Sequence, residues 1–326
     1  MSNAVSADIE QPRVTVLMPV FNAEKYIADA VRSVLDQSFT DFELLIVNDG
    51  STDNSASIIL AFDDARIRLL NCENRGVSAA LNTGLREAKG RYIARFDADD
   101  ICYRDRLRVQ VSFLDSHPEH ILVGSDVDYI TEEGNFIYRH YCFAYTDATI
   151  KERLYFYCPF IHSAVMYRKE PVLAVGGYEP AAHTFEDYFL WTLLAGKGKL
   201  ANLPESLVKV RLNPASVTMD EKWRGRRFRQ LKRQTIKSGT INADQETELL
   251  QILREQNNVR MKAGAYYALC AKKFLTDSYM PRAARRYAAH AISIQPLRWD
   301  NYALWLACYF PRPIVQWLGR RSPNRL

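Results

Sequence analysis

The sequence lacks long apolar runs and any recognisable leader. None of its 326 residues falls in an uninterrupted apolar window of about 18, the length that a membrane-spanning helix needs. The closest candidate, YALWLACYF at 302–310, is too short and is followed by Pro311 and Pro313. The N-terminal MSNAVSADIEQPR has neither the basic flank nor the apolar core of a secretory signal, so we expect no export and a flexible tail at residues 1–12.

Cysteine is sparse and scattered. The six cysteines form no CxxC pair and show no metal-finger spacing. Such a distribution favours buried, reduced thiols over a disulfide framework. These absences exclude a zinc finger and a disulfide-stabilised secreted protein, and we expect a cytoplasmic protein.

Charge divides the chain into two regions. A composition of 48% hydrophobic, 12% aromatic and 25% charged residues is typical of globular proteins and excludes general disorder. The net charge of +5 combines −9 over residues 1–220 with +14 over residues 221–326. The length fits roughly two domains. We therefore predict one domain at 13–220 and a separate basic region at 221–326.

Buried strands alternate with amphipathic helices in the first region. VTVLMPVF at 14–21, FELLIV at 42–47 and RYIARF at 91–96 are nearly continuous apolar runs, as in strands covered on both faces. A helical pattern follows the first run, with Asn22 as its candidate cap. This alternation predicts βαβ units, an α/β fold and a doubly wound sheet. Ligands bind such sheets at the carboxyl ends of the strands, where Asn22 and Asp49 are expected.

The motif RFDADD places three carboxylates just past one of these strands. One small residue separates Asp97 from Asp99, so their oxygens can face a single hard divalent cation such as Mn²⁺ or Mg²⁺. Such an ion shares its other positions with phosphate oxygens. The alternative is a solvated acidic turn, in which Asp99 or Asp100 caps the helix predicted around 105–117.

Three blocks carry a resemblance to a known family: LMPVFNAEKYIADAVRSVLDQSFTDFELLIVNDGSTDNS, ENRGVSAALNTGLREAKGRYIARFDADD and FEDYFLW. They resemble family 2 glycosyltransferases of GT-A fold, over residues 13–218. The resemblance implies a GT-A type nucleotide-binding, doubly wound mixed sheet flanked by helices, plus a small C-terminal all-helical region. It also implies polysaccharide biosynthesis by inverting sugar transfer, of hexosyltransferase type, from a nucleotide-diphosphate sugar to a glycan or lipid-linked saccharide acceptor. UDP is the expected nucleotide.

The resemblance assigns roles to individual carboxylates. Asp49 matches the residue that hydrogen-bonds a uracil-type base, Asp97 the residue directed at the ribose or the metal, and Asp99 the residue on the metal that bridges the diphosphate. Asp187 matches the catalytic base, which takes a proton from the acceptor hydroxyl. Glu186 stays open as an alternative base. Structural explanations also stay open, namely an Asx turn for Asp49 and helix N-terminal acids for Glu186 and Asp187.

The resemblance further implies a surface that lines the nucleotide. Besides Asp49 and Asp97, its expected members are Pro19, Phe21, Asn22, Glu24, Arg75, Asn82 and Arg211. Arg211 would pair with the diphosphate, whereas Arg75 and Asn82 fit a solvated helix surface equally well. The chain departs from the family at Asn213, where His is frequent.

Other residues near the predicted base have two interpretations. Trp191 lies one turn beyond Asp187 and fits either a sugar-stacking or a core position. His162 fits a hydrogen-bonding core position better than a metal ligand. Gly176 and Gly177 predict a turn before the helix that carries Asp187.

The basic C-terminal region is helical in pattern, without a clean tetratricopeptide-type repeat. Its Arg and Lys residues, together with Trp299, Trp305 and Trp317, fit peripheral contact with the anionic inner face of the cell membrane. A solvated basic face fits as well. Two alternative functions stay open: a catalytically inactive transferase-like scaffold, and a nucleic-acid- or membrane-binding protein that uses this region. No RRM, zinc-finger or helix-turn-helix signature is present, so we expect no nucleic-acid partner.

Overall fold

The computed structural model describes residues 11–214, 225–255 and 258–321, with side chains up to Gln316. The expected tail and the predicted domain boundary at 220/221 fall wholly or mostly outside these residues. The side chain of Trp317 does so too. The division into domains 13–220 and 221–326 therefore stays a prediction.

The described chain forms two compact units. Unit 1 comprises the residues through Asp126 together with Cys142–Val208. Unit 2 comprises Val127–Tyr141 and the residues from Lys209 onward. Each unit is thus built from segments that are far apart in the sequence.

Four parallel strands form the first half of the sheet. They are β1 (Val14–Val20), β2 (Phe42–Asp49), β3 (Ile67–Cys72) and β4 (Tyr92–Arg95). Their spatial order is β3-β2-β1-β4, and β1 pairs with both β2 and β4. All of β2 and nearly all of β1 is buried, as expected for strands covered on both faces. The predicted parallel, doubly wound arrangement is confirmed here.

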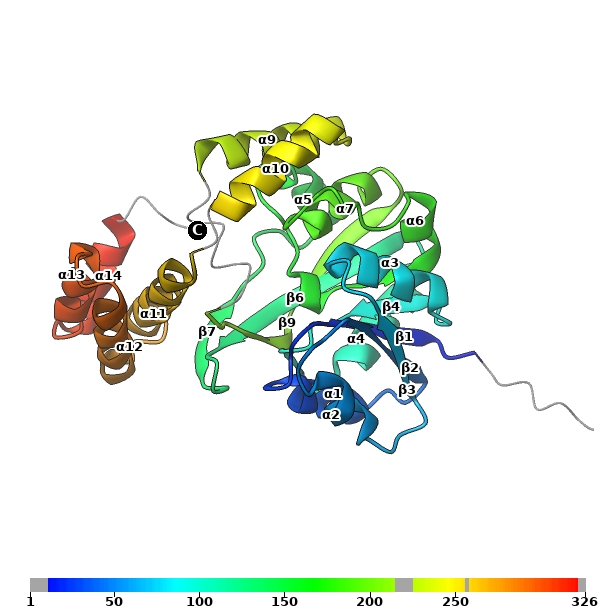
Figure 1. Cartoon of the computed structure of the whole chain (residues 1–326), viewed down its shortest axis with the longest axis horizontal. Helices are drawn as coiled ribbons and strands as arrows, with labels where there is room; N and C mark the ends of the chain where they lie inside the picture. Colours follow the sequence, from blue (N-terminus) through cyan, green and yellow to red (C-terminus); the bar gives the residue numbers. More distant parts are fainter. Residues whose placement is uncertain (1–10, 215–224, 256–257, 322–326) are drawn as a thin grey trace, which may run out of the picture. The chain divides into compact units, whose positions relative to one another are not determined.

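Helices flank these strands on opposite sides (Figure 1). They are α1 (Ile27–Leu35), α2 (Ser55–Leu60) and α3 (Val77–Glu87). In α1, the buried Ile27, Ala30, Val31 and Val34 recur at spacings of three and four, which is the face that the sequence predicts. The prediction that Asn22 caps this helix is wrong, because α1 begins only at Ile27.

The second half of the sheet adds strands of mixed direction. They are β5 (Ile101–Cys102), β6 (His120–Ile130), β8 (Met166–Arg168) and β9 (Lys199–Arg211). In the described residues the order is β3-β2-β1-β4-β8-β6-β9-β5, with β8 antiparallel to β4 and to β6. The sheet is therefore mixed, as the resemblance implies.

Short helices connect these strands. They are α4 (Arg106–Ser116), α5 (Asp147–Arg153), the 3₁₀ helix η1 (His162–Ala164), α6 (Lys169–Ala174) and α7 (Glu186–Leu194). Asp105 occupies the N-cap position of α4. The alternative in which Asp99 or Asp100 caps this helix is wrong, because both residues precede β5.

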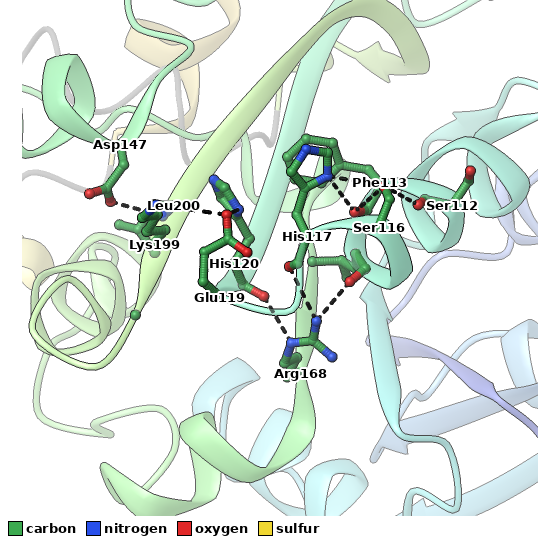
Figure 2. A network of polar contacts seen from close by, with 12 residues as sticks. Ser112, Phe113, Ser116, His117, Glu119, His120, Asp147, Arg168, Lys199 and Leu200 are labelled. Atoms are coloured by element: carbon green, nitrogen blue, oxygen red, sulfur yellow. Dashed lines mark hydrogen bonds and ion pairs between the residues drawn. The ribbon is translucent and has the colours of Figure 1, made fainter.

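Arg168 ties β8 to the end of α4 (Figure 2). Its Nε donates to the carbonyl of His120 at 2.8 Å, and its Nη2 donates to the carbonyls of Leu114 and His117 at 2.7 and 3.4 Å. Carbonyls at a helix C-terminus carry partial negative charge, so a cation is favourable there. These bonds anchor the short strand β8 between β4 and β6.

Unit 2 combines a hairpin with helices. Strand β7 (Phe136–His140) pairs antiparallel with the end of β6. The helices are α9 (Arg226–Ser238), α10 (Ala243–Glu255), α11 (Val259–Thr276), α12 (Pro281–Ile294), α13 (Trp299–Ala307) and α14 (Arg312–Arg321). Helix α12 packs on α11 and α13, and α11 also covers β7 (Figure 1). The predicted helical C-terminal region is confirmed. No helix of the described residues combines the length and apolar character needed to cross a bilayer.

Candidate active site

The carboxyl ends of β1, β2 and β4 meet at one edge of the sheet in unit 1. Pro19 of β1 lies opposite Val47 of β2, and Leu17 lies opposite Arg95 of β4. From β1 the chain proceeds to β2 and β3 on one side and later to β4 on the other. Strand order therefore switches next to β1, and open α/β sheets bind ligands outside such a switch point.

Asn22 and Glu24 join the loops that follow β1 and β2. Asn22 has φ 49°, in the left-handed region that Asn tolerates. Its side-chain oxygen accepts from the N–H of Thr52 at 2.8 Å, and its own N–H donates to the hydroxyl of Ser51 at 3.1 Å. Oε2 of Glu24 accepts from the N–H and the side-chain amide of Asn54 at 3.0 and 2.8 Å. These bonds give both residues a structural role at the predicted nucleotide edge.

Asp49 ends β2 and holds the turn before α3. One carboxylate oxygen accepts from the N–H of Arg75 and the other from that of Gly76, both at 2.9 Å. Gly50, with φ 71°, lets the backbone of Asn74 pass close to it, because a Cβ at residue 50 would lie 2.8 Å from the backbone nitrogen of Asn74. A carboxylate offers roughly four lone-pair positions, so Asp49 can still accept a further hydrogen bond. A hydrogen bond from Asp49 to the base of a nucleotide stays a prediction.

Three carboxylates gather after β4. Asp97, Asp99 and Asp100 each offer an oxygen, and these oxygens all lie within 4.8 Å of one another. An all-oxygen set of this kind fits a hard cation such as Mn²⁺ or Mg²⁺. The sequence prediction assigned Asp97 and Asp99 to the metal and missed Asp100. The signal that could have found it was the third carboxylate of RFDADD itself.

Arg95 is a buried cation beside this cluster. Its side chain is 4% exposed and forms an ion pair with Asp97. Burial disfavours the charged guanidinium, but the charge and hydrogen bond of Asp97 more than offset this and raise the pKa of Arg95 above its ordinary value. Arg95 therefore stays charged and counters the mutual repulsion of the carboxylates. The sequence patterns predicted no role for Arg95, although a charge inside the apolar run RYIARF was the available signal.

Helix α7 adds two carboxylates, Glu186 and Asp187, in its first turn. Glu186 is only 9% exposed, and burial together with the charge of Asp187 raises its pKa to about 7. The charges of Arg95 and Asp97 also act on Glu186, so α7 begins close to the cluster after β4. Asp187 is half-buried, and its Oδ1 accepts from the N–H of Tyr188 at 2.6 Å. The predicted base and the predicted metal ligands are thus neighbours in unit 1.

Trp191 and His162 belong to the core beneath this site. Trp191 is completely buried, and its ring centroid lies 5.8 Å from those of Phe160 and His162. His162 shares a hydrogen bond of 3.0 Å with the hydroxyl of Tyr178, and burial lowers the pKa of its imidazole well below the ordinary value. The core interpretation therefore fits both residues, and sugar stacking by Trp191 does not.

Asn82 fixes the turn that precedes α7. Its side-chain amide accepts from the N–H of Tyr178 at 2.8 Å and donates to the carbonyl of the same residue at 2.7 Å. Gly176 and Gly177 have φ of 93° and 77°, which confirms the predicted turn. The amide of Asn82 thus has a structural partner, and contact with a nucleotide stays a prediction.

Four residues of the predicted nucleotide surface remain, and they differ in burial. Pro19 is in β1, and Phe21, just after it, is 51% exposed. The side chain of Arg75 is exposed. Arg211 is a buried residue of unit 2, whose Nη1 donates to the carbonyl of Glu132 at 2.7 Å. Its contact with a diphosphate stays a prediction.

Sequence comparison places this site in a known family. Residues 15–176 match the family model for glycosyl transferase family 2. The chain is similar to the amylovoran biosynthesis glycosyltransferase AmsE of Erwinia amylovora, with 31% identity over 215 residues that cover 64% of this chain and 80% of AmsE. It also matches glycosyltransferases of Rickettsia felis and Rickettsia conorii at 30% and 29% identity, but spans only 35% and 34% of their length.

Two solved structures resemble the fold. S. aureus TarS 1–349 in complex with UDP-GlcNAc has a TM-score of 0.56 and 17% identity, with 96% of this chain and 93% of that chain covered. The mannosyltransferase PcManGT of Pyrobaculum calidifontis, in complex with GDP-Man and Mn²⁺, has a TM-score of 0.53 and 19% identity, with 96% and 89% covered. At such identities the likeness shows the fold alone, which is that of GT-A glycosyltransferases. With the sequence match and the similarity to AmsE, it follows that the chain belongs to glycosyl transferase family 2.

Proposed function

We propose that this chain is an inverting glycosyltransferase of hexosyltransferase type, which moves a sugar from a UDP-sugar to a glycan or lipid-linked saccharide acceptor. The observation that best supports the proposal is that two sets of carboxylates lie close together in unit 1. One is the cluster of Asp97, Asp99 and Asp100 after β4, and the other is Glu186 and Asp187 at the start of α7. Metal-dependent inverting transfer requires these two elements, a cation site for a diphosphate and a base.

The donor side of the proposal relies on Asp49 and the acidic cluster. Asp49 has lone pairs left for a ring N–H of the base, and exposed Phe21 borders the same edge of the sheet. Asp97, Asp99 and Asp100 would hold Mn²⁺ or Mg²⁺, which when bound supplies positive charge that stabilises the departing diphosphate. TarS was solved with UDP-GlcNAc and PcManGT with GDP-Man and Mn²⁺, which supports a nucleotide-sugar donor.

The acceptor side relies on Asp187 as the base. Inverting transfer needs one carboxylate that removes the proton of the acceptor hydroxyl on the face opposite the leaving group. The second acid of hydrolytic glycosidases is not required. Asp187 suits this role better than Glu186, because it is half-buried while Glu186 is 9% exposed and binds its proton more tightly than usual.

The first test is calorimetric titration of UDP, GDP and dTDP into the purified chain, with and without Mn²⁺. We expect UDP to bind in a manganese-dependent manner and Asp99→Asn to lose that dependence. Asp63→Asn is the matched control, because Asp63 is exposed and precedes β3, at the amino ends of the parallel strands. Binding of GDP or dTDP instead would change the proposed nucleotide, and binding of none would contradict the proposal.

Stereochemistry provides an independent test. With a UDP-sugar that the chain turns over, NMR of the product should show that the anomeric configuration of the transferred sugar is opposite to that in the donor. Retention of configuration would rule out single displacement with Asp187 as base.

A further inference from the structure

Helix α13 packs with one face and leaves an apolar face exposed. Asn301 and Cys308 are buried, and the side-chain amide of Asn301 donates to the carbonyl of Ala291 in α12 at 3.3 Å. On the opposite face Trp299, Tyr302 and Leu306 follow one another at spacings of three and four, with 78%, 43% and 56% of their surface exposed. An apolar helix face is normally buried against another element.

Further exposed apolar side chains flank the helix at its two ends. We define the α13 face as Leu297, Trp299, Tyr302, Leu306, Tyr309 and Phe310. Leu297 is 97% exposed, and Tyr309 and Phe310 are 58% and 46% exposed. Scattered exposed apolar residues need no explanation, but a contiguous apolar and aromatic patch marks an interaction surface.

Positive charge lies beside this face. Residues 281–321 contain seven Arg and one acidic residue, Asp300. Arg282, Arg285 and Arg286 are exposed on neighbouring α12, and the guanidinium of Arg285 lies 5.3 Å from the ring centroid of Tyr309. Asp300 is already paired with Arg298 at 2.6 Å. The α13 face is therefore flanked by a helix, α12, with exposed positive charge.

We propose that the α13 face docks on an anionic lipid bilayer. Trp and Tyr favour the boundary between headgroups and acyl chains, and Arg interacts with anionic headgroups while its alkyl stem lies along apolar surface. With nine residues α13 is about 13 Å long, so it lies in the interface and does not span the bilayer. A second copy of the chain fits less well, because a two-fold contact through this face would bring the same Arg residues together.

This inference goes beyond the proposed function and does not depend on it. The α13 face lies in unit 2, whereas the carboxylates of the candidate active site lie in unit 1. Loss of nucleotide binding would leave membrane docking intact, and the reverse also holds. The two proposals can therefore fail separately.

The test is co-sedimentation of the full chain with vesicles of phosphatidylcholine alone or mixed equally with phosphatidylglycerol. We expect binding to the mixed vesicles, and a fall of at least about tenfold in the partition coefficient for Trp299→Ser combined with Leu306→Ser, because both side chains lose apolar contact with lipid. Arg282→Gln combined with Arg285→Gln should weaken binding to the mixed vesicles. Leu60→Ser is the matched control, since Leu60 is 71% exposed on α2 and should not affect binding.

Retained circular dichroism and an unchanged midpoint of urea denaturation for each variant would show that it is folded. Absence of wild-type binding to the mixed vesicles would overturn the proposal. Equal binding of the α13 double variant and the Leu60→Ser control would overturn it too. A wild-type dimer in sedimentation equilibrium that the α13 variant dissociates would replace the bilayer with a second copy of the chain.

Discussion

At the scale of single residues, the carboxylates of unit 1 differ in what already binds them. Asp49 accepts two backbone N–H groups, and Asp97 is paired with Arg95. Glu186 is buried with less compensation, since its Oε2 has no hydrogen-bond partner in the described structure. Burial of a weakly compensated acid favours its neutral form, so the pKa values of adjacent Glu186 and Asp187 are expected to differ.

The first prediction compares these two adjacent acids. Asp187→Asn should lower kcat by about 10²- to 10⁴-fold, because the acceptor hydroxyl loses its base, and should leave UDP affinity nearly unchanged. Glu186→Gln should retain kcat within about tenfold, since Gln has the same shape as the neutral acid. Steady-state kinetics and calorimetry on both variants measure this. If Glu186→Gln proves the more damaging change, the assignment of the base must be reversed.

The second prediction concerns pH and the stability of the metal-free chain. Because the pKa of Glu186 is raised from 4.5 to about 7 in the folded state, the folded protein binds more protons than the unfolded one in this range. Its free energy of unfolding should therefore fall as pH rises from about 4.5 to about 7, by about 3 kcal/mol at most, and should then level off. Glu186→Gln should remove this slope.

Urea unfolding in EDTA at a series of pH values measures that effect. The informative quantity is the difference in unfolding free energy between wild type and Glu186→Gln. A difference that stays constant across the range would mean that Glu186 titrates normally. Subtraction of the two curves cancels the contributions of other acids that both proteins share.

Sequence patterns predicted the residues whose chemistry depends on local spacing. The oxygens of Asp97 and Asp99 were expected to meet because a single small residue separates them, and the structure brings them together. Asp100 and Arg95 were missed, because their partners depend on how β4 enters the core. Likewise, no local sequence pattern indicates whether Trp191 faces a sugar or the core, since Phe160 and His162 contact it from a distant segment.

At the scale of elements, close contact between β1 and the approach to β4 positions the acidic cluster. The N–H of Gly90 donates to the hydroxyl of Thr15 at 2.8 Å. A Cβ at residue 90 would lie 2.3 Å from the backbone nitrogen of Thr15 and 2.6 Å from the carbonyl carbon of Val14. Both atoms belong to the backbone of β1, so movement of a flexible side chain cannot relieve the clash.

The third prediction follows from this contact. Gly90→Ala should lower the free energy of unfolding by about 2 kcal/mol or more, because it forces β4 away from β1. Gly196→Ala is the matched control, since a Cβ there meets nothing within 4 Å and should change stability by less than about 0.5 kcal/mol. Midpoints of urea denaturation measure both. Equal midpoints would show that β1 and β4 adjust without cost.

The parallel strands and their helices were predictable because each carries its own pattern. β2 is a continuous apolar run, and α1 has its apolar residues at helical spacing. The short strands β5 and β8 had no such pattern, since two or three residues become a strand only through pairing with distant partners. The alternative cap of α4, Asp99 or Asp100, was wrong for a similar reason, because several acids precede the helix and only the local backbone selects Asp105.

At the scale of the whole molecule, charge and contacts divide the chain differently. The change in net charge places a boundary near residue 221, and it reflects only the local amino-acid composition. The contact-based units instead join Val127–Tyr141 to the C-terminal helices. That grouping rests on pairing and packing between segments more than a hundred residues apart, as between Glu132 and Tyr266. No local pattern in the sequence encodes it.

The fourth prediction tests that grouping. Strand β7 pairs with β6 on one edge, and an uncovered edge strand is prone to open. In unit 2, Nζ of Lys273 lies 4.2 Å from the ring centroid of Tyr138, and the hydroxyl of Tyr287 donates to Glu133 at 3.0 Å. A chain that ends at residue 258 lacks these contacts, so amide hydrogen exchange in β7 should accelerate by about tenfold or more.

A chain that ends at Phe310 is the matched control, because it removes α14 and keeps α11 and α12, which contact the hairpin, together with α13. Its β7 amides should exchange at the wild-type rate, and the amides of β2 in unit 1 serve as an internal reference in both truncated chains. Unchanged exchange of β7 in the shorter chain would mean that the hairpin is stable by itself. The C-terminal helices would then be attached to the transferase fold without stabilising it, and the boundary expected from charge would describe the folding units better than the contacts do.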